Sequence, residues 1–511
     1  QKVENGMLLC HTVTGTLILL SDKEYEKICL GKPLTEEWAK ILFSMGYLPD
    51  ISVDEYAMID QRRAQEKNSG TGTDAITSYT ILPTTRCNAR CFYCYENGIP
   101  QKNMSRKTAE DVADFIIRRS CGQKVHLSWF GGEPTIAHAV ISLICQRLRE
   151  YNIEFHSSMI SNGFLMDKCL VSVAAKEWNL QHIQITIDGT QSVYNDTKNY
   201  KGKAENPFLT VLSNMNTLLD ANIRISVRIN LGQHNFEDVY LLIQYLTRRF
   251  SKKKGIRVYV HEIDNYYSDE SYFQLEERTN ELNNILVQEG LQDRPELPVL
   301  RLHSCMADND ASILINPDGG LGKCEHFVFD KLHSSIYSDE ADMKLVNEWK
   351  EPVRFEQCHT CPFYASCLRL KWCNGGNYSC RSGVIQSKLA QTRNTMLQIY
   401  NDWTMKRVHF LEKDTFQLSA SYEITYIDEE RSAVFQLQEA GENVIIPVNQ
   451  TVEDILEMLQ ETHTLREIVC MLEEKYDTSG FDVADIVEDY LLFIINHGVC
   501  IHTLVGTESS C

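Results

Sequence analysis

Three cysteines near residue 90 have a spacing that suits an iron-sulfur cluster. Cys87, Cys91 and Cys94 form a Cys-x-x-x-Cys-x-x-Cys run that follows the strand-like apolar segment 79–82. A short loop after a strand brings three thiolates to three corners of a four-iron cluster and leaves the fourth iron without a protein ligand. An open iron can bind a small molecule, whereas a four-cysteine site is closed and is usually structural or electron-carrying. A zinc site or unrelated thiols are the alternatives.

The composition favours a cluster protein of a reducing compartment. The chain has 511 residues, enough for roughly three or four domains. Its 18 cysteines exceed what packing requires, and the chain is far longer than a disulfide scaffold. The net charge of -20 argues against a nucleic-acid partner. We read no signal peptide and no membrane span, and we expect a cytoplasmic protein.

Strand-like and helix-like runs alternate from about residue 79 to residue 262, which predicts an α/β fold with parallel strands and right-handed crossovers. Six such units make a partial (β/α)6 TIM barrel. The predicted strands are 79–82, 125–130, 153–161, 182–187, 223–229 and 256–260.

Polar residues stand at the carboxyl ends of these strands, where barrel enzymes assemble their sites. The second strand ends in Gly-Gly-Glu-Pro, in which glycines permit close backbone approach and the carboxylate can receive an ammonium group. Each of these residues alone is more typical of a turn at a strand end than of a binding site. The candidates are Gly131, Gly132, Glu133, Pro134, Asn162, Thr186, Asp188, Arg228 and Asn230.

A second group of seven cysteines lies between residues 305 and 380, too dense for ordinary packing. Four of them, Cys358, Cys361, Cys367 and Cys373, could alone form a zinc ribbon. The whole set is Cys305, Cys324, Cys358, Cys361, Cys367, Cys373 and Cys380.

The first cysteine run, with Tyr93 before its third cysteine, resembles the signature of radical S-adenosylmethionine (SAM) enzymes. The resemblance implies a [4Fe-4S] cluster on Cys87, Cys91 and Cys94 whose open iron binds SAM. One electron from the cluster then cleaves SAM to a 5'-deoxyadenosyl radical. Tyr93 would lie near the adenine, and residues 131–134 match the motif that binds the SAM amino group.

The same resemblance implies further SAM contacts. Thr186, Arg228 and Asn230 would line the SAM ribose and carboxylate, with Asn162 and Asp188 as additional contacts. Relatives often carry a histidine-aspartate pair and an arginine soon after the fourth strand. This chain has Tyr-Asn-Asp-Thr-Lys-Asn at 194–199 instead, so Lys198 is the candidate substitute for the carboxylate contact.

Joined to the first run, the second cysteine group resembles the SPASM extension, which carries two auxiliary [4Fe-4S] clusters. Cys358, Cys361, Cys367 and Cys380 would hold the distal cluster, and Cys305, Cys324 and Cys373 the one nearer SAM. The interval before Cys373 is five residues where three are usual. Seven cysteines leave one cluster a ligand short, and a substrate thiolate could fill that open iron.

The two ends of the chain predict small domains with winged-helix character. Residues 1–66 suggest a hairpin turning near 14–15 and helices at 24–30 and 36–45. The polar run 61–74 reads as a linker, and we place the linker between the domains at 67–78. Residues 410–511 suggest strands at 434–447 that turn at 441–443, helices at 452–460, 465–476 and 483–496, and a short run at 499–501. The last helix has no basic residue, which argues against DNA binding.

The C-terminal pattern resembles the PqqD-like peptide-chaperone domain of pyrroloquinoline quinone maturation, which implies leader-peptide binding at a sheet edge. A dimerising or purely structural appendage is the alternative. The barrel would then occupy 79–300 and the SPASM region 301–400.

Together these features predict a radical SAM/SPASM maturase that installs thioether crosslinks in a ribosomally made peptide, similar to sactionine and ranthionine synthases. Its partners would be a cysteine-containing precursor peptide with a leader and a flavodoxin- or ferredoxin-like one-electron donor. No catalytic side chain is assigned. Formylglycine formation in a sulfatase, a carbon-carbon crosslink, and a non-catalytic iron-sulfur protein are the alternatives. Most of the other eight cysteines are expected to be small core residues.

Overall fold

The computed structural model divides the chain into two compact units, residues 1–397 and 398–511. The structure describes residues 1–3, 6–34, 39–40, 42–43, 47, 54–68, 75–201, 206–263, 269–303, 305–373, 380, 382–405, 415–418, 422–427, 432–437, 443–447, 450–476, 483–496 and 500–503.

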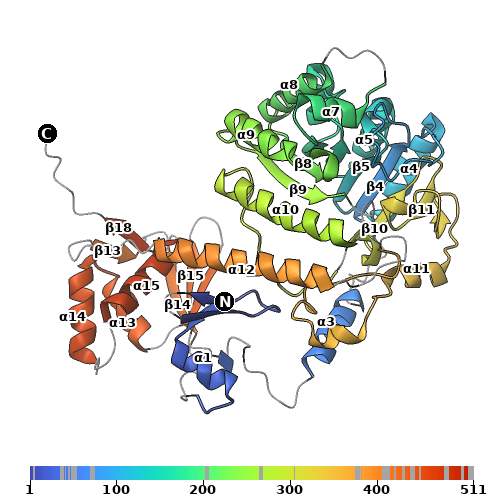
Figure 1. The fold of residues 1–511 in the computed structure, drawn as a ribbon. Coiled ribbons are helices and arrows are strands. Elements are labelled where there is room, and N and C mark those ends of the chain that lie inside the picture. Colours follow the sequence, from blue (N-terminus) through green and yellow to red (C-terminus); the bar gives the residue numbers. More distant parts are fainter. Residues whose placement is uncertain are drawn as a thin grey trace, which may run out of the picture. The chain divides into compact units, whose positions relative to one another are not determined.

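The first unit is built on a nine-stranded sheet in the order β12-β11-β10-β4-β5-β6-β7-β8-β9 (Figure 1). The six consecutive parallel strands from β4 to β9 confirm the predicted partial barrel and lie within a few residues of the predicted ranges. They are β4 Ser78–Thr84, β5 Val125–Gly131, β6 Phe155–Ser161, β7 Leu180–Thr186, β8 Arg224–Leu231 and β9 Ile256–Glu262.

Helices connect successive strands, as parallel pairing requires. Ser105 caps α4 and Asp167 caps α6, each by accepting a backbone N–H of the first turn. The connecting helices are α4 Arg106–Arg119, α5 His138–Glu150, α6 Lys168–Lys176, α7 Gln191–Lys198, α8 Pro207–Asp220 and α9 Asp238–Phe250, and α10 Asp269–Gln288 follows β9.

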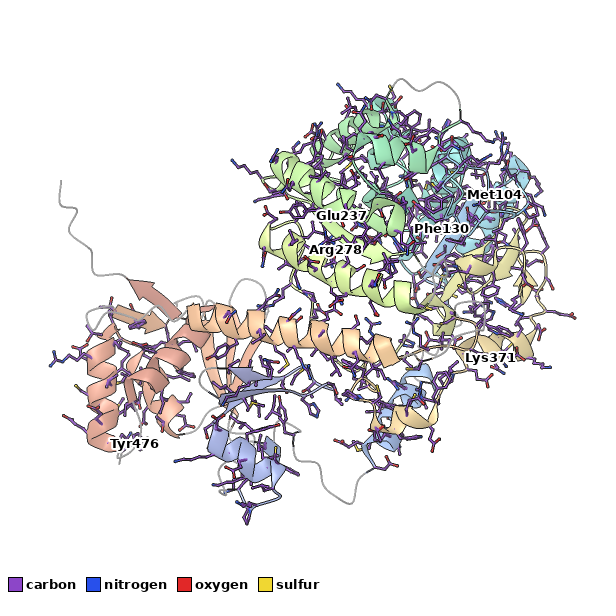
Figure 2. The ribbon with its side chains drawn as sticks, viewed as in Figure 1. Met104, Phe130, Glu237, Arg278, Lys371 and Tyr476 are labelled. Atoms are coloured by element: carbon purple, nitrogen blue, oxygen red, sulfur yellow. The ribbon has the colours of Figure 1, made fainter. Side chains whose placement is uncertain are left out.

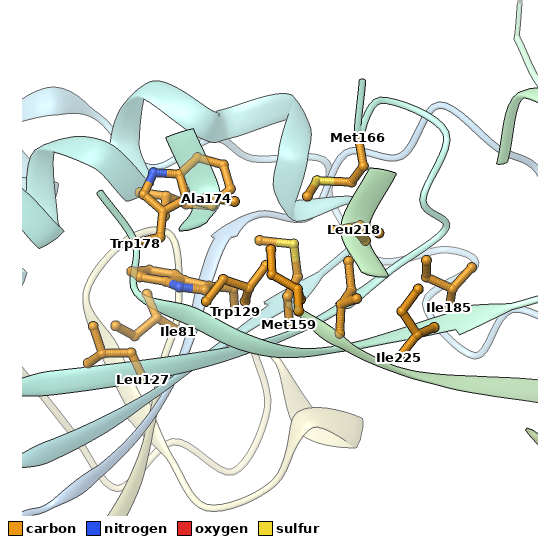
Figure 3. Close-up of a cluster of buried hydrophobic side chains, with 14 of the residues drawn as sticks. Ile81, Leu127, Trp129, Met159, Met166, Ala174, Trp178, Ile185, Leu218 and Ile225 are labelled. Atoms are coloured by element: carbon orange, nitrogen blue, oxygen red, sulfur yellow. The ribbon is translucent and has the colours of Figure 1, made fainter. Parts of the chain in front are cut away.

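The main core lies between the barrel strands and these helices (Figure 3). Alternate residues of β5 are buried beneath the helices, among them Leu127 and Trp129, while Ser128 on the opposite face is half-buried. This period-two pattern leaves the inner face of the strands available for polar side chains.

The sheet continues beyond the boundary predicted at residue 300. Strand β10 Ser312–Ile315 pairs in parallel with β4, and β11 Gly320–Gly322 and β12 Ser334–Ser335 follow by antiparallel pairing. The cysteine-rich region therefore shares the barrel's sheet. Beyond it lie α11 Met343–Lys350 and α12 Ser382–Met405.

Burial of His333, just before β12, makes the stability of this sheet extension depend on pH. Burial and the nearby Lys323 lower the pKa of His333 from 6.5 to about 4, against the opposing effect of Asp342. Between pH 6.5 and pH 4, therefore, the His333 imidazole is protonated in the unfolded chain and neutral in the folded chain. The His333 contribution is present above pH 6.5 and is lost as the pH falls toward 4.

Between pH 7 and pH 5 we expect His333 to reduce the free energy of unfolding by about 2 kcal/mol. Urea denaturation of the metal-free protein at both values tests this, with His333→Gln as the comparison. The variant should lose less stability on acidification, and an equal loss in both proteins would contradict the assignment.

The N-terminal segment confirms the predicted hairpin and corrects the predicted linker. Strands β2 Gly6–Cys10 and β3 Leu17–Leu20 pair on either side of residues 11–16, with β1 Lys2–Val3 beside β2 and α1 Asp22–Cys29 after β3. Residues 61–68 are helical, within α3 Glu55–Asn68. The linker prediction was wrong there because the polar residue Arg63 is buried by contacts with distant segments. The predicted helix at 36–45 lies largely outside the described residues.

The second unit has the predicted helices and more strands than expected. Helices α13 Gln450–Met458, α14 Leu465–Lys475 and α15 Val483–Asn496 enclose a core that includes Phe416, Leu456 and Leu491. One sheet has the order β17-β13-β18 and the other β14-β15-β16. Their strands are β13 Thr415–Leu418, β14 Tyr422–Ile427, β15 Ser432–Leu437, β16 Asn443–Pro447, β17 His463–Thr464 and β18 Cys500–Thr503.

Among the described helices, none combines the length and the apolar character that crossing a bilayer demands.

Candidate active site

The loop after β4 carries Cys87, Cys91 and Cys94 as three free, half-buried thiols. They are close enough to influence one another electrostatically, and burial raises the pKa of Cys87 to about 12 and of Cys94 to about 11. Ala89 N–H donates to the Cys87 sulfur over 3.4 Å. Three thiols on one short loop are a donor set suited to an iron-sulfur cluster.

Within the described ranges, no three His, Cys, Asp or Glu side chains are arranged to hold one metal ion. The cysteines of a four-iron cluster bind different irons and need not converge on one point.

Backbone and amide hydrogen bonds hold the cysteine loop against the ends of neighbouring elements. Arg90 N–H donates to the carbonyl oxygen of Lys198, and Lys201 N–H donates to that of Asn88, both over 2.8 Å. Asn162 Nδ2, just beyond β6, donates to Asn88 Oδ1 over 2.7 Å. The predicted SAM contact Asn162 thus also supports the loop. Asn88 was missed in the sequence because its role depends on partners brought together by folding.

A buried network joins four residues singled out in the sequence. Tyr93 O–H donates to Asp188 Oδ2 over 2.5 Å and accepts from Lys198 Nζ and Asn230 Nδ2, each over 3.1 Å. Lys198 Nζ and Asp188 Oδ2 form an ion pair at 2.8 Å with side-chain exposures of 3% and 0%. Asn235, which the sequence did not indicate, donates to the carbonyl oxygens of Asp188 and Asn230.

The network fixes the protonation states of Tyr93 and Lys198. Burial and the neighbouring Asp188 carboxylate raise the pKa of Tyr93, so the phenol keeps its proton. Burial alone would lower the pKa of Lys198, but Asp188 and Tyr93 outweigh it, so the pKa lies above its usual value and the ammonium stays charged. Lys198, predicted to meet the SAM carboxylate, is thus the counter-ion of Asp188 in this structure.

The two glycines after β5 allow the chain to approach its own backbone. A Cβ at Gly131 would lie 2.3 Å from the Thr84 carbonyl oxygen, and a Cβ at Gly132 would lie 2.5 Å from that of Arg86. Gly131 also has φ +108°, which favours glycine. The absence of side chains thus lets the backbone of residues 131–132 lie directly against the segment that leads into Cys87, where Gly132 N–H donates to the Thr84 carbonyl oxygen over 3.2 Å.

Glu133 is fully buried and anchors this turn to β6. Its carboxylate accepts from Thr135 N–H and O–H, from Ser161 O–H, and from Asn162 N–H over 2.7 Å. Burial raises its pKa, and these hydrogen bonds oppose the shift. An incoming ammonium group, as predicted for Glu133, would have to share a carboxylate that already accepts four hydrogen bonds. Pro134 is buried at the start of the short helix Pro134–Ala137.

The remaining predicted SAM contacts lie on the half-buried inner face of the barrel. Thr186 of β7 is paired in register with Arg228 of β8. Arg228 Nε donates to Asn230 Oδ1 over 2.8 Å, which connects the inner face to the Tyr93 network. Phe130, on the strand that leads into Gly131, lies within the same unit (Figure 2).

The cysteine-rich region brings the second array together in two groups. One cavity is lined by all four cysteines predicted for the distal auxiliary cluster, together with Arg354 and Arg369. Cys305, Cys324 and Cys373 influence one another electrostatically, as a shared site requires. The four in the cavity are Cys358, Cys361, Cys367 and Cys380.

The prediction that the other cysteines are core residues was mostly wrong. Cys145 is buried and Cys10 is half-buried, whereas four others are exposed because they lie at turns or on outer helix faces. The exposed ones are Cys29, Cys121, Cys169 and Cys470. Cys511 lies outside the described residues.

Residues 81–246 match the family model of the Radical SAM superfamily. This segment is a radical SAM domain. The domain includes the three-cysteine loop, the Gly131–Pro134 turn and the Tyr93 network, so the sequence resemblance at these positions agrees with the family match.

The curated relatives match part of this chain over part of their own lengths. The chain is 24% identical over 175 residues to an uncharacterized protein of Methanocaldococcus jannaschii, covering 34% of this chain and 59% of that protein. It is 32% identical over 129 residues to a probable GTP 3',8-cyclase of Pyrococcus horikoshii, covering 25% and 37%. The chain thus spans less than two thirds of both relatives.

The fold resembles that of solved structures of anSMEcpe. The structure of anSMEcpe with bound AdoMet, another name for SAM, superimposes with a TM-score of 0.51 at 15% identity, over 64% of this chain and 99% of that chain. A further structure of anSMEcpe, with bound AdoMet and Cp18Cys peptide, gives a TM-score of 0.50 over the same shares at 15% identity. The superimposed part of this chain therefore shares the fold of anSMEcpe.

Proposed function

We propose that this chain is a radical SAM enzyme that modifies a ribosomally made peptide and installs a cysteine thioether crosslink. The observation that carries the proposal is the pair of cysteine arrays in one compact unit. The first is held on the loop of a radical SAM domain, and four members of the second line one cavity. The anSMEcpe structure of the same fold holds both AdoMet and a peptide, which favours a peptide substrate here.

Cys87, Cys91 and Cys94 would hold the radical cluster, leaving one iron for SAM. When bound, the cluster and SAM together would supply the 5'-deoxyadenosyl radical that the reaction uses. The backbone hydrogen bonds that Arg90 donates and Asn88 accepts hold the cysteine loop in place. The three hydrogen-bond partners of the Tyr93 hydroxyl hold the Tyr93 ring next to the cysteines. Removal of a hydrogen atom needs no general base, so the chief task of these residues is to hold the reactants in place.

The second array would hold two auxiliary clusters. Cys358, Cys361, Cys367 and Cys380 complete one ligand set around their cavity. Cys305, Cys324 and Cys373 provide three ligands of the other and leave a position that a substrate thiolate suits. That missing ligand is the reason to favour sulfur chemistry over a carbon-carbon bond or formylglycine formation.

The second unit is proposed to bind the leader of the precursor peptide. Both of its three-stranded sheets have outer strands, and a leader can join such a sheet as one more strand. The N-terminal sheet β1-β2-β3 is the other candidate. The proposal includes a cytoplasmic location, because clusters with open irons are sensitive to oxygen, and a flavodoxin- or ferredoxin-like electron donor.

The product of the reaction tests the proposal. Anaerobic enzyme would be incubated with SAM, dithionite and cysteine-containing precursor peptides encoded beside it, and the peptides analysed by tandem mass spectrometry. A thioether product loses two hydrogens and one thiol that can be alkylated. Loss of two hydrogens with all thiols still alkylated would indicate a carbon-carbon crosslink instead, and an aldehyde would indicate formylglycine.

A further inference from the structure

Helix α3 carries a buried arginine, Arg63, whose guanidinium donates to three backbone carbonyl oxygens in distant parts of the chain. Arg63 is 4% exposed. Its Nε donates to the carbonyl oxygen of Arg301 over 3.0 Å, and its Nη2 donates to those of Tyr364 and Ala365 over 3.0 Å and 2.6 Å. These partners are 238 to 302 residues away in the chain.

The three carbonyls belong to the segments that carry both auxiliary cysteine groups. Arg301 precedes Cys305 by four residues, and Tyr364 and Ala365 stand between Cys361 and Cys367. The two segments also meet directly, because Arg301 N–H donates to the Ala365 carbonyl oxygen over 3.0 Å. The Arg63 guanidinium therefore connects the segment before Cys305 to the loop between Cys361 and Cys367, that is, the two proposed auxiliary sites.

Other side chains of α3 reinforce the same junction. Tyr364 O–H donates to Asp60 Oδ2 over 2.5 Å, and the Tyr56 ring meets the Tyr364 ring edge-on at 4.8 Å. Ile59 packs in one apolar cluster with Tyr364, and Cys358 lies against that cluster. The helix predicted in part as a linker thus forms one wall of the cysteine-rich region.

Positive charge at this junction suits the cavity beside it. Arg354 lines the cavity with the four cysteines and lies 3.5 Å from Asp60, while both Arg63 and Arg354 lie over the Tyr364 ring. A cluster held by four thiolates is anionic, so the guanidinium groups of Arg354 and Arg369, which line the cavity, favour its binding. The planar fork of arginine spreads its N–H donors over three nitrogen atoms, so it can reach carbonyl oxygens that are too far apart for the single ammonium nitrogen of a lysine.

We propose that Arg63 is a positioning residue for the auxiliary clusters: it holds the Cys361–Cys367 loop and the approach to Cys305 in the arrangement in which these cysteines take up iron. This inference rests on the proposed function, which assigns those cysteines to clusters. The inference gives a residue of the N-terminal helix α3 a role in shaping cluster sites that lie more than 200 residues later in the chain.

Iron content tests the inference in a background that lacks the radical cluster. Full-length Cys87→Ala/Cys91→Ala/Cys94→Ala protein, purified anaerobically after reconstitution, should hold about eight irons per chain. Adding Arg63→Met should reduce this to about four or fewer, with weaker cluster absorption and a weaker electron paramagnetic resonance signal after reduction. Arg63→Lys should fall between the two. The matched control is Arg62→Met, an exposed neighbour on the same helix, which should keep all of the iron.

Arg63→Met with the three cysteines restored checks that the barrel still folds. Its radical cluster should retain a SAM-dependent change in the electron paramagnetic resonance spectrum. Full auxiliary iron in Arg63→Met would overturn the positioning role while leaving the proposed function intact. An iron-free background protein would overturn the auxiliary clusters themselves and this inference with them. Equal loss of both cluster types would mean that Arg63 stabilises the whole unit and positions neither site.

Discussion

Lys198→Met should destabilise the protein by about 3–5 kcal/mol, because it leaves a buried carboxylate without its counter-ion. The Lys198 and Asp188 side chains are almost completely excluded from solvent and lie 2.8 Å apart. Tyr93 would also lose one of its three hydrogen-bond partners. The loss would appear in urea denaturation of the metal-free full-length chain.

An exposed ion pair of the same unit provides the matched control. Lys124 and Glu154 lie 2.6 Å apart with side-chain exposures of 54% and 72%. Lys124→Met should therefore cost less than about 1 kcal/mol. Adding Asp188→Asn to Lys198→Met should recover part of the loss, since the unpaired charge is removed. Equal small costs for both lysine variants would show that the buried pair does not hold the network together.

Gly132→Ala should lower the yield of 5'-deoxyadenosine by about 100-fold, because the turn would be pushed away from the cysteine loop. The added Cβ would meet the Arg86 carbonyl oxygen at 2.5 Å and the Thr85 carbonyl oxygen at 2.7 Å. Both contacts are backbone atoms, so no side-chain rotation relieves them. The yield per chain after addition of SAM and dithionite is the measurement.

Gly290→Ala is the control for adding a Cβ to a glycine where that Cβ meets no other atom. Gly290 has φ +70° with no atom within 4 Å of the added Cβ, so alanine there costs stability without moving the site. It should retain the wild-type yield of 5'-deoxyadenosine. A Gly132→Ala variant as active as Gly290→Ala would mean that the close approach of residues 131–132 to the cysteine loop is not required.

Local sequence patterns predicted the barrel because its strands are short apolar runs separated by amphipathic helices. The same patterns missed α3 as a contact element, since a buried arginine looks like a linker residue until its distant carbonyl partners are known. The extension of the sheet by β10 was likewise hidden, because pairing between strands more than 200 residues apart leaves no local signal.

The candidate site was predictable where chemistry depends on spacing along the chain. The four cysteines that line the distal cavity are the four that the resemblance to the SPASM extension grouped, whereas spacing alone had also suggested a zinc ribbon with Cys373 as its fourth ligand. The protein partners of Glu133 and Lys198 were not predictable, because nothing local in the sequence shows that these side chains bind residues of other strands and loops. A charge at a strand end looks the same in sequence whether it faces a ligand or a neighbour.

Iron content and SAM cleavage measured together test the central claim most directly. Wild-type protein and the Cys87→Ala/Cys91→Ala/Cys94→Ala variant would be purified anaerobically, assayed for iron and sulfide, and then given SAM and dithionite. The account predicts about twelve irons per chain falling to about eight in the variant, with 5'-deoxyadenosine formed by the wild type alone. Zinc in place of iron, or about four irons unaffected by the substitution, would contradict it.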